Sequence, residues 1–122
     1  MITEGITWHA LTLEPDQHQA AKDFFISTVG LTPAVDTDEF VMFQMPNGSM
    51  LELYTPASTP PYGYNGGVAF GFRVDDIEQA SIEIQAAGYE PLAEITRMED
   101  IGYAYRHFRG PGDIIIGLNE QK

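Results

Sequence analysis

The chain has 122 residues, the usual size of one domain, and 43% of them are hydrophobic, which is enough to form one core. Its net charge of −12 comes from eight acids and one base in residues 1–60 and ten acids and five bases in residues 61–122, and this balance argues against nucleic-acid binding. The absence of cysteine excludes disulfides and zinc–thiolate sites, and no apolar run reaches the roughly 18 residues of a membrane span.

The N-terminus "MITEGITWHA" lacks the pattern of a signal peptide, so we expect a cytoplasmic protein. Residues 6–13 alternate apolar and polar side chains, as a strand does. Asp16, followed three residues later by Gln19, predicts the start of a helix that runs to about residue 29 and ends at Gly30. We expect His18 to be a solvated surface residue of this helix, whose buried face is predicted to hold Ala21, Phe24, Phe25 and Thr28.

A hairpin is predicted next, over "FVMFQMPNGSMLELY" at 40–54, with Pro-Asn-Gly as its turn. The stretch from 55 to 66 is rich in proline and glycine and is predicted to be a linker or lid. Its tyrosines, Tyr62 and Tyr64, either cover a ligand or simply pack within the loop, and the second interpretation is the one we expect.

The second half repeats the first. A strand is predicted over 68–74, a helix over 77–87 with the pair Asp76 and Gln79 at its start and Gly88 at its end, and a hairpin follows. Three pairs in the two hairpins stand 65 residues apart, and this spacing sets Glu52 against Gly117: Phe43 and Phe108, Pro46 and Pro111, Leu53 and Leu118. We therefore predict one domain with module one at about 5–54, a linker at 55–66 and module two at about 67–119.

Two strand–helix–hairpin copies, each ending in a Phe-x-x-Pro hairpin, resemble the glyoxalase / bleomycin-resistance / extradiol dioxygenase superfamily, also called vicinal oxygen chelate. The resemblance implies an α+β fold in which two βαβββ modules form a cupped sheet with helices outside. It also implies a dimer. In the metal enzymes of the family a divalent ion lies in the cup, and each module offers one ligand from its first strand and one from its last.

Carried onto this sequence, the resemblance gives His9 and Glu52 as the ligands of the first module, both suited to a divalent transition metal. The matching positions of the second module are Ala69 and Gly117, which have no ligating atoms; a slip of one residue would replace Ala69 by Phe70 with the same result. The predicted metal site is therefore incomplete. We expect no cofactor, with a divalent metal as the alternative.

Alternation along the strands sorts the faces. Phe40, Met42, Gln44, Met50 and Glu52 are predicted to face the cup, as are Tyr105, His107, Arg109, Ile115 and Gly117, whereas Phe108, Ile114, Ile116 and Leu118 face the core. His107 would complete a set of two histidines and one carboxylate with His9 and Glu52, or else be a polar group of the pocket wall. The predicted ligand-binding residues are His9, Met42, Gln44, Met50, Glu52, Ala69, Tyr105, His107, Arg109 and Gly117.

These observations predict a protein that binds a small molecule in the cup, with the acidic charge drawing cationic ligands by long-range steering. The alternative is a divalent-metal-dependent lyase, isomerase or dioxygenase that uses His9 and Glu52. A third interpretation is a metal-free enzyme in which the same two residues act as acid and base. We expect a homodimer, and no nucleic-acid or membrane partner.

Overall fold

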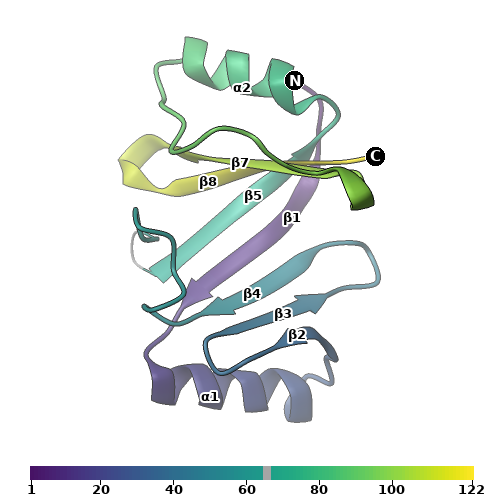
Figure 1. The fold of residues 1–122 in the computed structure, drawn as a ribbon, viewed down its shortest axis with the longest axis vertical. Helices are drawn as coiled ribbons and strands as arrows, with labels where there is room; N and C mark the ends of the chain where they lie inside the picture. The colour runs from purple at the N-terminus through teal and green to yellow at the C-terminus, as the bar shows by residue number, and fades with distance from the viewer. Residues whose placement is uncertain (65–66) are drawn as a thin grey trace. The chain divides into compact units, whose positions relative to one another are not determined.

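The computed structural model describes residues 1–64 and 67–122 and contains two βαβββ modules (Figure 1). The first consists of β1 (Thr3–Thr12), α1 (Pro15–Asp23), a π-helix (Phe24–Thr28), β2 (Pro33–Asp36), β3 (Phe40–Gln44) and β4 (Met50–Tyr54). The second consists of β5 (Val68–Val74), α2 (Ile77–Ala86), β6 (Thr96–Met98), β7 (Tyr103–Arg109) and β8 (Ile115–Gln121), with short 3₁₀ turns at Glu99–Ile101 and Pro111–Asp113. The predicted α+β class and the repeated order of elements are confirmed.

Contacts divide the chain into two compact units, one of Trp8–Val68 and the other of Met1–Thr7 together with Ala69–Lys122. The first seven residues belong to the second unit because their polar groups bond there. The amino group of Met1 lies 2.8 Å from a carboxylate oxygen of Glu83 in α2, and the Thr7 hydroxyl donates to Oδ1 of Asn119 in β8 at 3.0 Å. The boundary between the units therefore falls within β1.

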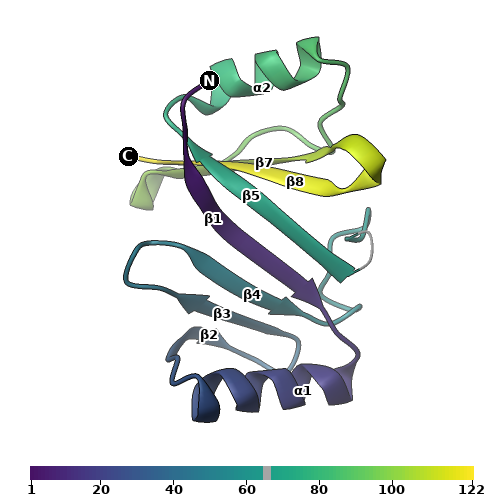
Figure 2. The same cartoon turned by 180° about the vertical axis from the view of Figure 1, so that it is seen from behind.

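In the unit Trp8–Val68 the strands lie in the order β2-β3-β4-β1. β3 and β4 form an antiparallel hairpin, whereas β1 runs parallel to β4, as Figure 2 shows. Val41, Phe43 and Leu53 form the core of this unit, and Ala21 and Phe25 from the helical segment pack against it. Phe24, which we predicted to share that buried face, is 51% exposed. The prediction failed because the helix widens to a π-helix at this residue, and the spacing of the side chains changes with it.

The start of α1 also differs from the prediction. The helix begins at Pro15 with Glu14 as a cap that makes no side-chain bond, so Asp16 lies in the first turn and not at the cap. His18 is not a solvated surface residue: it is only 2% exposed, and its Nε2 lies 3.0 Å from the carbonyl oxygen of Leu53 in β4. His18 therefore lies on the buried face of the helix, where it joins α1 to β4.

In the second unit the strands lie in the order β5-β8-β7-β6, and α2 packs on β7 and β8. The Asp76 side chain accepts from the backbone N–H of Gln79 at 3.1 Å, which confirms the predicted cap. Gly88 ends the helix with φ +98°, and Gly30 closes the corresponding segment of the first module with φ +86°. The core of this unit consists of Val74, Ile77, Ala80, Ala104, Phe108 and Leu118.

Ile114, predicted in that core, is 42% exposed because it follows the 3₁₀ turn and precedes β8. The register nevertheless confirms the 65-residue correspondence of the two hairpins. Phe43 pairs with Leu51 in the first, and Phe108 pairs with Ile116 in the second. None of the helices in the described residues combines the length and the apolar character that a bilayer crossing requires.

Candidate functional site

Glu52 lies at the middle of β4, between Ala10 on β1 and Met42 on β3. Residues paired across neighbouring strands project to the same face, and alternate residues of one strand do so as well. The register therefore gathers the following side chains on the face of Glu52: Trp8, Ala10 and Thr12 from β1, Phe40, Met42 and Gln44 from β3, and Met50 and Tyr54 from β4. The opposite face carries the core of the unit.

The Glu52 carboxylate is held by two neutral donors. The indole Nε1 of Trp8 and the hydroxyl of Tyr54 both donate to Oε1, the second of them at 3.1 Å. No group of the described residues donates to the other carboxylate oxygen, Oε2. Among the described residues, the protein thus fixes one oxygen of this carboxylate through two donors.

Burial raises the pKa of the Glu52 carboxyl, and the hydrogen bonds from Trp8 and Tyr54 oppose this increase. Burial also raises the pKa of the Tyr54 phenol, and the negative charge of Glu52 adds to the effect. Tyr54 therefore stays protonated at any physiological pH and remains a donor to Glu52. A carboxyl whose proton affinity is increased in this way can accept a hydrogen bond from a ligand or exchange a proton with it.

Aromatic rings surround this carboxylate. The Tyr64 ring stands edge-on to Trp8 at 5.8 Å between ring centroids and to Tyr54 at 5.5 Å, and Phe40 packs on Tyr54 at 5.0 Å. Trp8 and Tyr64 are both buried. We call Glu52, Trp8, Tyr54 and Tyr64 the Glu52 cluster. It joins one carboxylate to three large aromatic rings, and such a combination of a polar group with apolar surface is typical of small-molecule sites.

His9 does not join this cluster. It pairs with Leu51, so its side chain projects to the face opposite Glu52; there it is exposed, with Nδ1 3.2 Å from the carbonyl oxygen of Met50. Trp8 stands on the Glu52 side in its place. The strand register also corrects the predicted match between Ala69 and His9 by one residue. Ala10 pairs with Glu52 in the first module, and Gly71 pairs with Gly117 in the second. Ala69 therefore corresponds to Trp8, and Phe70 corresponds to His9.

The first module does not fit a divalent ion held by His9 and Glu52. The two side chains lie on opposite faces of the sheet, and Oε1 of Glu52 already accepts from two donors that carry protons and cannot ligate. Across residues 1–64 and 67–122, no three histidine or acidic side chains gather as metal ligands would. We therefore assign no chemical step at this site to a divalent ion.

In the second module the register sets the predicted residues on one face of the sheet. His107 of β7 pairs with Gly117 of β8, Tyr105 pairs with Asn119, and Arg109 pairs with Ile115. Ala69 follows the same alternation, two residues before Gly71, which pairs with Gly117. A side chain at Gly71 would bring its Cβ to 2.7 Å from the carbonyl oxygen of Gly117, so strand packing alone requires glycine at position 71.

His107 is the perturbed ionisable group of this face. Burial lowers its pKa to about 4, so its imidazole is neutral at pH 7. The rings of Tyr105 and His107 lie 5.4 Å apart, and Tyr103 continues the row at 6.1 Å from Tyr105. Arg109, exposed at the end of β7, extends the row with a cation. A neutral imidazole, phenols and a guanidinium thus follow one another along one strand.

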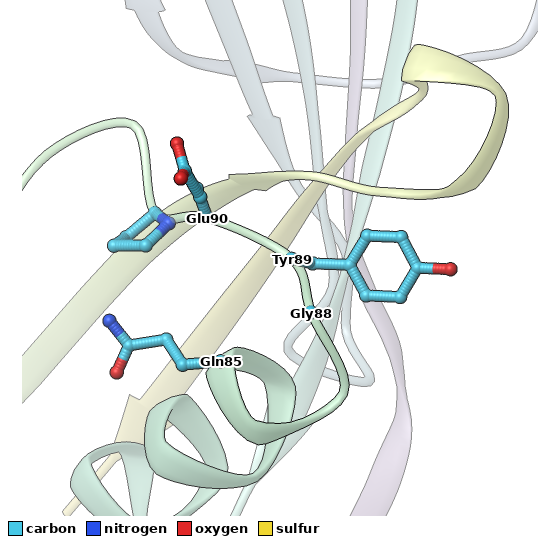
Figure 3. Close-up of a pocket in the computed structure, with 5 residues that line it drawn as sticks. Gln85, Gly88, Tyr89 and Glu90 are labelled. Carbon is cyan, nitrogen blue, oxygen red and sulfur yellow. The ribbon is translucent and has the colours of Figure 1, made fainter.

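A surface recess of about 430 Å³ lies elsewhere in this unit, at the end of α2, lined by Gln85, Gly88, Tyr89, Glu90 and Pro91. Figure 3 shows the Tyr89 ring directed away from Gln85 and Glu90, so these polar groups do not converge on one point. The recess holds none of the predicted ligand-binding residues. We do not assign it a function.

The sequence singled out Glu52, and it gave Tyr64 two interpretations, a cover over a ligand or packing within the loop, but it did not single out Trp8 and Tyr54. The signal for Trp8 was available: it is the one tryptophan of the chain, and it lies an even number of residues from Ala10, the partner of Glu52. Tyr54 is two residues from Glu52 and shares its face for the same reason. Tyr64 follows no such periodicity because it comes from the segment after β4, so its position depended on the tertiary structure.

The fold of the chain is that of several solved structures. It matches a Mn(II)-bound glyoxalase from Novosphingobium aromaticivorans with a TM-score of 0.76 and 13% identity, covering 97% of this chain and 39% of that one. It matches a glyoxalase/bleomycin resistance protein/dioxygenase superfamily member from Vibrio splendidus 12B01 with a TM-score of 0.64 and 18% identity, covering 96% and 100%. Methylmalonyl-CoA epimerase from Mycobacterium tuberculosis matches with a TM-score of 0.66 and 14% identity, covering 98% and 89%.

No curated protein matches the sequence. The model of one family does, over residues 8–118, a range that runs from Trp8 at the Glu52 cluster to Leu118 in the core of the second module. This match covers most of the chain and agrees with the resemblance that the two hairpins carry. The protein therefore belongs to the Glyoxalase/Bleomycin resistance protein/Dioxygenase superfamily.

Proposed function

We propose that this protein binds a small organic molecule at the Glu52 cluster, and that Glu52 itself, rather than a metal ion between His9 and Glu52, is the polar anchor of the ligand. The observation that carries the proposal is the double hydrogen bond to Oε1 from Trp8 and Tyr54. It holds the carboxylate in one orientation while Oε2 remains for the ligand. Anchors of this kind, fixed beforehand and surrounded by aromatic surface, lower the entropy cost of binding.

Charge indicates which group of the ligand meets Glu52. The protein carries a net charge of −12, which raises the local concentration of cations, and aromatic faces attract a cation further. A protonated amine satisfies both the carboxylate and the rings. A ligand carboxylate, in contrast, would face a second negative charge in a partly dry environment.

We propose further ligand contacts in each of the two units, taken separately. Met42, Gln44 and Met50 stand beside Glu52 and supply adaptable surface to the ligand. In the second module we propose Tyr105, His107, Arg109 and Gly117 as ligand contacts, with Ala69 beside them. Support comes from their common face and from the neutral state of His107, which lets its imidazole donate from one nitrogen and accept at the other.

The alternative function is that of a divalent-metal-dependent lyase, isomerase or dioxygenase. Its support is the superfamily itself, in which one structural neighbour is a Mn(II)-bound glyoxalase. The positions of His9 and Glu52 on opposite faces weigh against it. An enzyme without metal, with Glu52 as acid or base, is favoured only by the raised pKa of this carboxyl.

Trp8 makes the proposal directly testable, because the one tryptophan of the chain donates to the anchor. We would titrate the purified protein with benzylamine, benzyl alcohol and benzoate, which share a ring and differ in charge, and follow Trp8 emission and equilibrium dialysis. Benzylamine is expected to bind at least about tenfold tighter than benzoate, equivalent to about 1.4 kcal/mol. Glu52→Gln should remove this preference, and Glu39→Gln, which changes an exposed acid of the same unit, should preserve it.

Equal binding of the three ring compounds, or a preference that survives in Glu52→Gln, would overturn the proposed function. Elemental analysis of protein purified without chelator tests the alternative. One tightly held transition-metal ion per chain that disappears in Glu52→Gln would favour the metal-dependent enzyme.

A further inference from the structure

Tyr64 is an unusual member of the Glu52 cluster because it comes from the segment that follows β4. Its side chain is only 7% exposed, and its ring contacts the two residues that hold Glu52. The planes of Tyr64 and Trp8 meet at 76° and those of Tyr64 and Tyr54 at 79°, so both contacts are edge-to-face. Aromatic pairs prefer this geometry. The protein thus places a phenol ring of its own against the walls of the proposed site.

The beginning of this segment is fastened by polar bonds. The Ser58 hydroxyl donates to the carbonyl oxygen of Glu39 at 2.6 Å, and the hydroxyls of Thr12 and Thr59 lie 3.1 Å apart. Beyond Thr59 the chain passes through Pro60 and Pro61 and turns at Gly63, where φ is +65°. Residues 55–59 are therefore anchored on the first module, and the turn that follows carries Tyr64 back over the cluster.

We infer that the Tyr64 ring occupies the place of the ligand: the natural ligand carries an aromatic ring that replaces Tyr64 between Trp8 and Tyr54, and a donor group that reaches Oε2 of Glu52. This inference rests on the proposed function and deepens it by naming the ligand class, an aromatic amine or a similar ring with a proton to donate. It also makes Tyr64 a competitor of the ligand. Binding then requires the ring to leave the cluster.

The walls of the cluster explain why a ring should be exchanged for a ring. Trp8 and Tyr54 are tied to the same carboxylate oxygen, so they keep their orientation when Tyr64 leaves. A flexible aliphatic ligand would leave part of the Trp8 and Tyr54 rings without contact, whereas a planar ring restores both edge-to-face pairs. Tyr64 thus acts as a sample of the chemistry that the site accepts.

Two probes report on the two parts of the inference. p-Cresol reproduces the Tyr64 side chain, and tyramine adds a protonated amine to the same ring. With Trp8 emission as the readout, Tyr64→Ala is expected to bind p-cresol at least about tenfold tighter than the parent, because the competitor is gone. Tyramine should bind Tyr64→Ala more tightly than p-cresol does, and adding Glu52→Gln should remove that difference. Tyr89→Ala, which changes a tyrosine after α2 in the other unit, is the control and should bind p-cresol like the parent.

Hydrogen exchange of the unmodified protein provides a test that needs no substitution. Saturation with tyramine is expected to increase exchange of the amides of residues 62–64, because Tyr64 is displaced, and to leave the anchored residues 55–59 unchanged. Increased protection of this segment, or weaker tyramine binding by Tyr64→Ala, would show that Tyr64 is a wall of the site and would overturn the inference while leaving Glu52-dependent binding intact. A third outcome is that p-cresol binds Tyr64→Ala while tyramine leaves the hydrogen exchange of the parent unchanged. In that case the substitution has only created an artificial cavity, and the inference is overturned as well. If neither protein binds a probe in a Glu52-dependent way, the proposed function fails too.

Discussion

At the scale of single residues, Glu52 shows how a carboxylate can be kept on a largely apolar face. Burial disfavours its charge, and Trp8 and Tyr54 compensate by donating to the same oxygen. An amide oxygen would accept the same two bonds without the cost of a buried charge. Burying Glu52 thus costs more free energy than burying glutamine at this position would, and a role in ligand binding would account for this cost.

The raised pKa of Glu52 gives a prediction with a defined sign. A carboxyl whose pKa is higher in the folded than in the unfolded protein contributes stability below its usual pKa of 4.5, and the contribution is lost as the pH rises through the folded value. The free energy of unfolding of Glu52→Gln minus that of the parent should therefore be larger at pH 7 than at pH 4. Urea unfolding of both proteins at the two pH values measures this, and an equal difference at both would contradict it.

His107 gives the opposite pH dependence. Its pKa falls from 6.5 to about 4 on folding, so the unfolded chain binds the proton first, and stability is lost as the pH decreases from 6.5 toward 4. The full loss corresponds to roughly 3 kcal/mol as an upper bound, and less for a side chain that is not fully buried. His107→Gln should reduce the loss of stability between pH 7 and pH 4. An NMR titration of the His107 ring tests the premise directly, since a midpoint near pH 6.5 would refute it.

At the scale of elements, His18 joins α1 to β4. The residue is almost fully buried, and its ring nitrogen bonds the carbonyl oxygen of Leu53, next to Glu52 in the strand. His18→Ala removes this bond and leaves a cavity, so we expect a loss of about 2–3 kcal/mol in the free energy of unfolding. His9→Ala is the matched control, because His9 is exposed, and it should cost less than about 0.5 kcal/mol. Similar losses for both variants would place His18 at the surface.

The two helix starts provide a second paired test. Asp76 caps α2 through the N–H of Gln79, whereas Asp16 lies within the first turn of α1 and caps nothing. Asp76→Ala should reduce the free energy of unfolding by about 1 kcal/mol. Asp16→Ala should reduce it by less than half of that, because only its interaction with the helix dipole is lost. Thermal or urea unfolding compares the two variants. A larger loss of stability for Asp16→Ala than for Asp76→Ala would support the predicted cap at Asp16.

At the scale of the whole molecule, much of the fold could be predicted from the sequence because each element predicted in one half has a counterpart in the other. The hairpin pairs 65 residues apart keep their register, and the caps and glycines of the second helix are where the pattern set them. The first module departed from the pattern at α1, where the π-helix moved Phe24 out of the core. A local pattern does not reveal such a change of helical period, because it is decided by packing.

The candidate site was harder to predict than the fold. A shift of one residue moves a strand side chain to the other face, so the choice between His9 and Trp8 depended on a register that the sequence did not define. The second module shows the same shift, since Ala69 corresponds to Trp8. Glu52, in contrast, lies in a hairpin whose turn fixes its register, and its face could be predicted correctly.

Metal binding gives a prediction for the whole protein. Anything that binds only the folded state raises its melting temperature by mass action. Because His9 and Glu52 lie on opposite faces, millimolar Mn(II) or Ni(II) should leave the melting temperature unchanged, within about 1 °C, whereas saturating benzylamine should raise it. Differential scanning calorimetry compares the two additions. A rise with metal that Glu52→Gln abolishes would show that Glu52 is a metal ligand after all.

The correspondence of Glu52 with Gly117 has a consequence for how such a chain evolves. If a single module assembled with an identical copy, every substitution would appear twice, and an acid gained at one position would be gained at both. A chain that carries the two copies in tandem is free of this coupling. One copy retains a carboxylate among aromatic rings, and the other has a glycine opposite a neutral imidazole. The duplicated chain is therefore asymmetric in chemistry although it is repetitive in structure, and substitutions in one half can be selected without being repeated in the other.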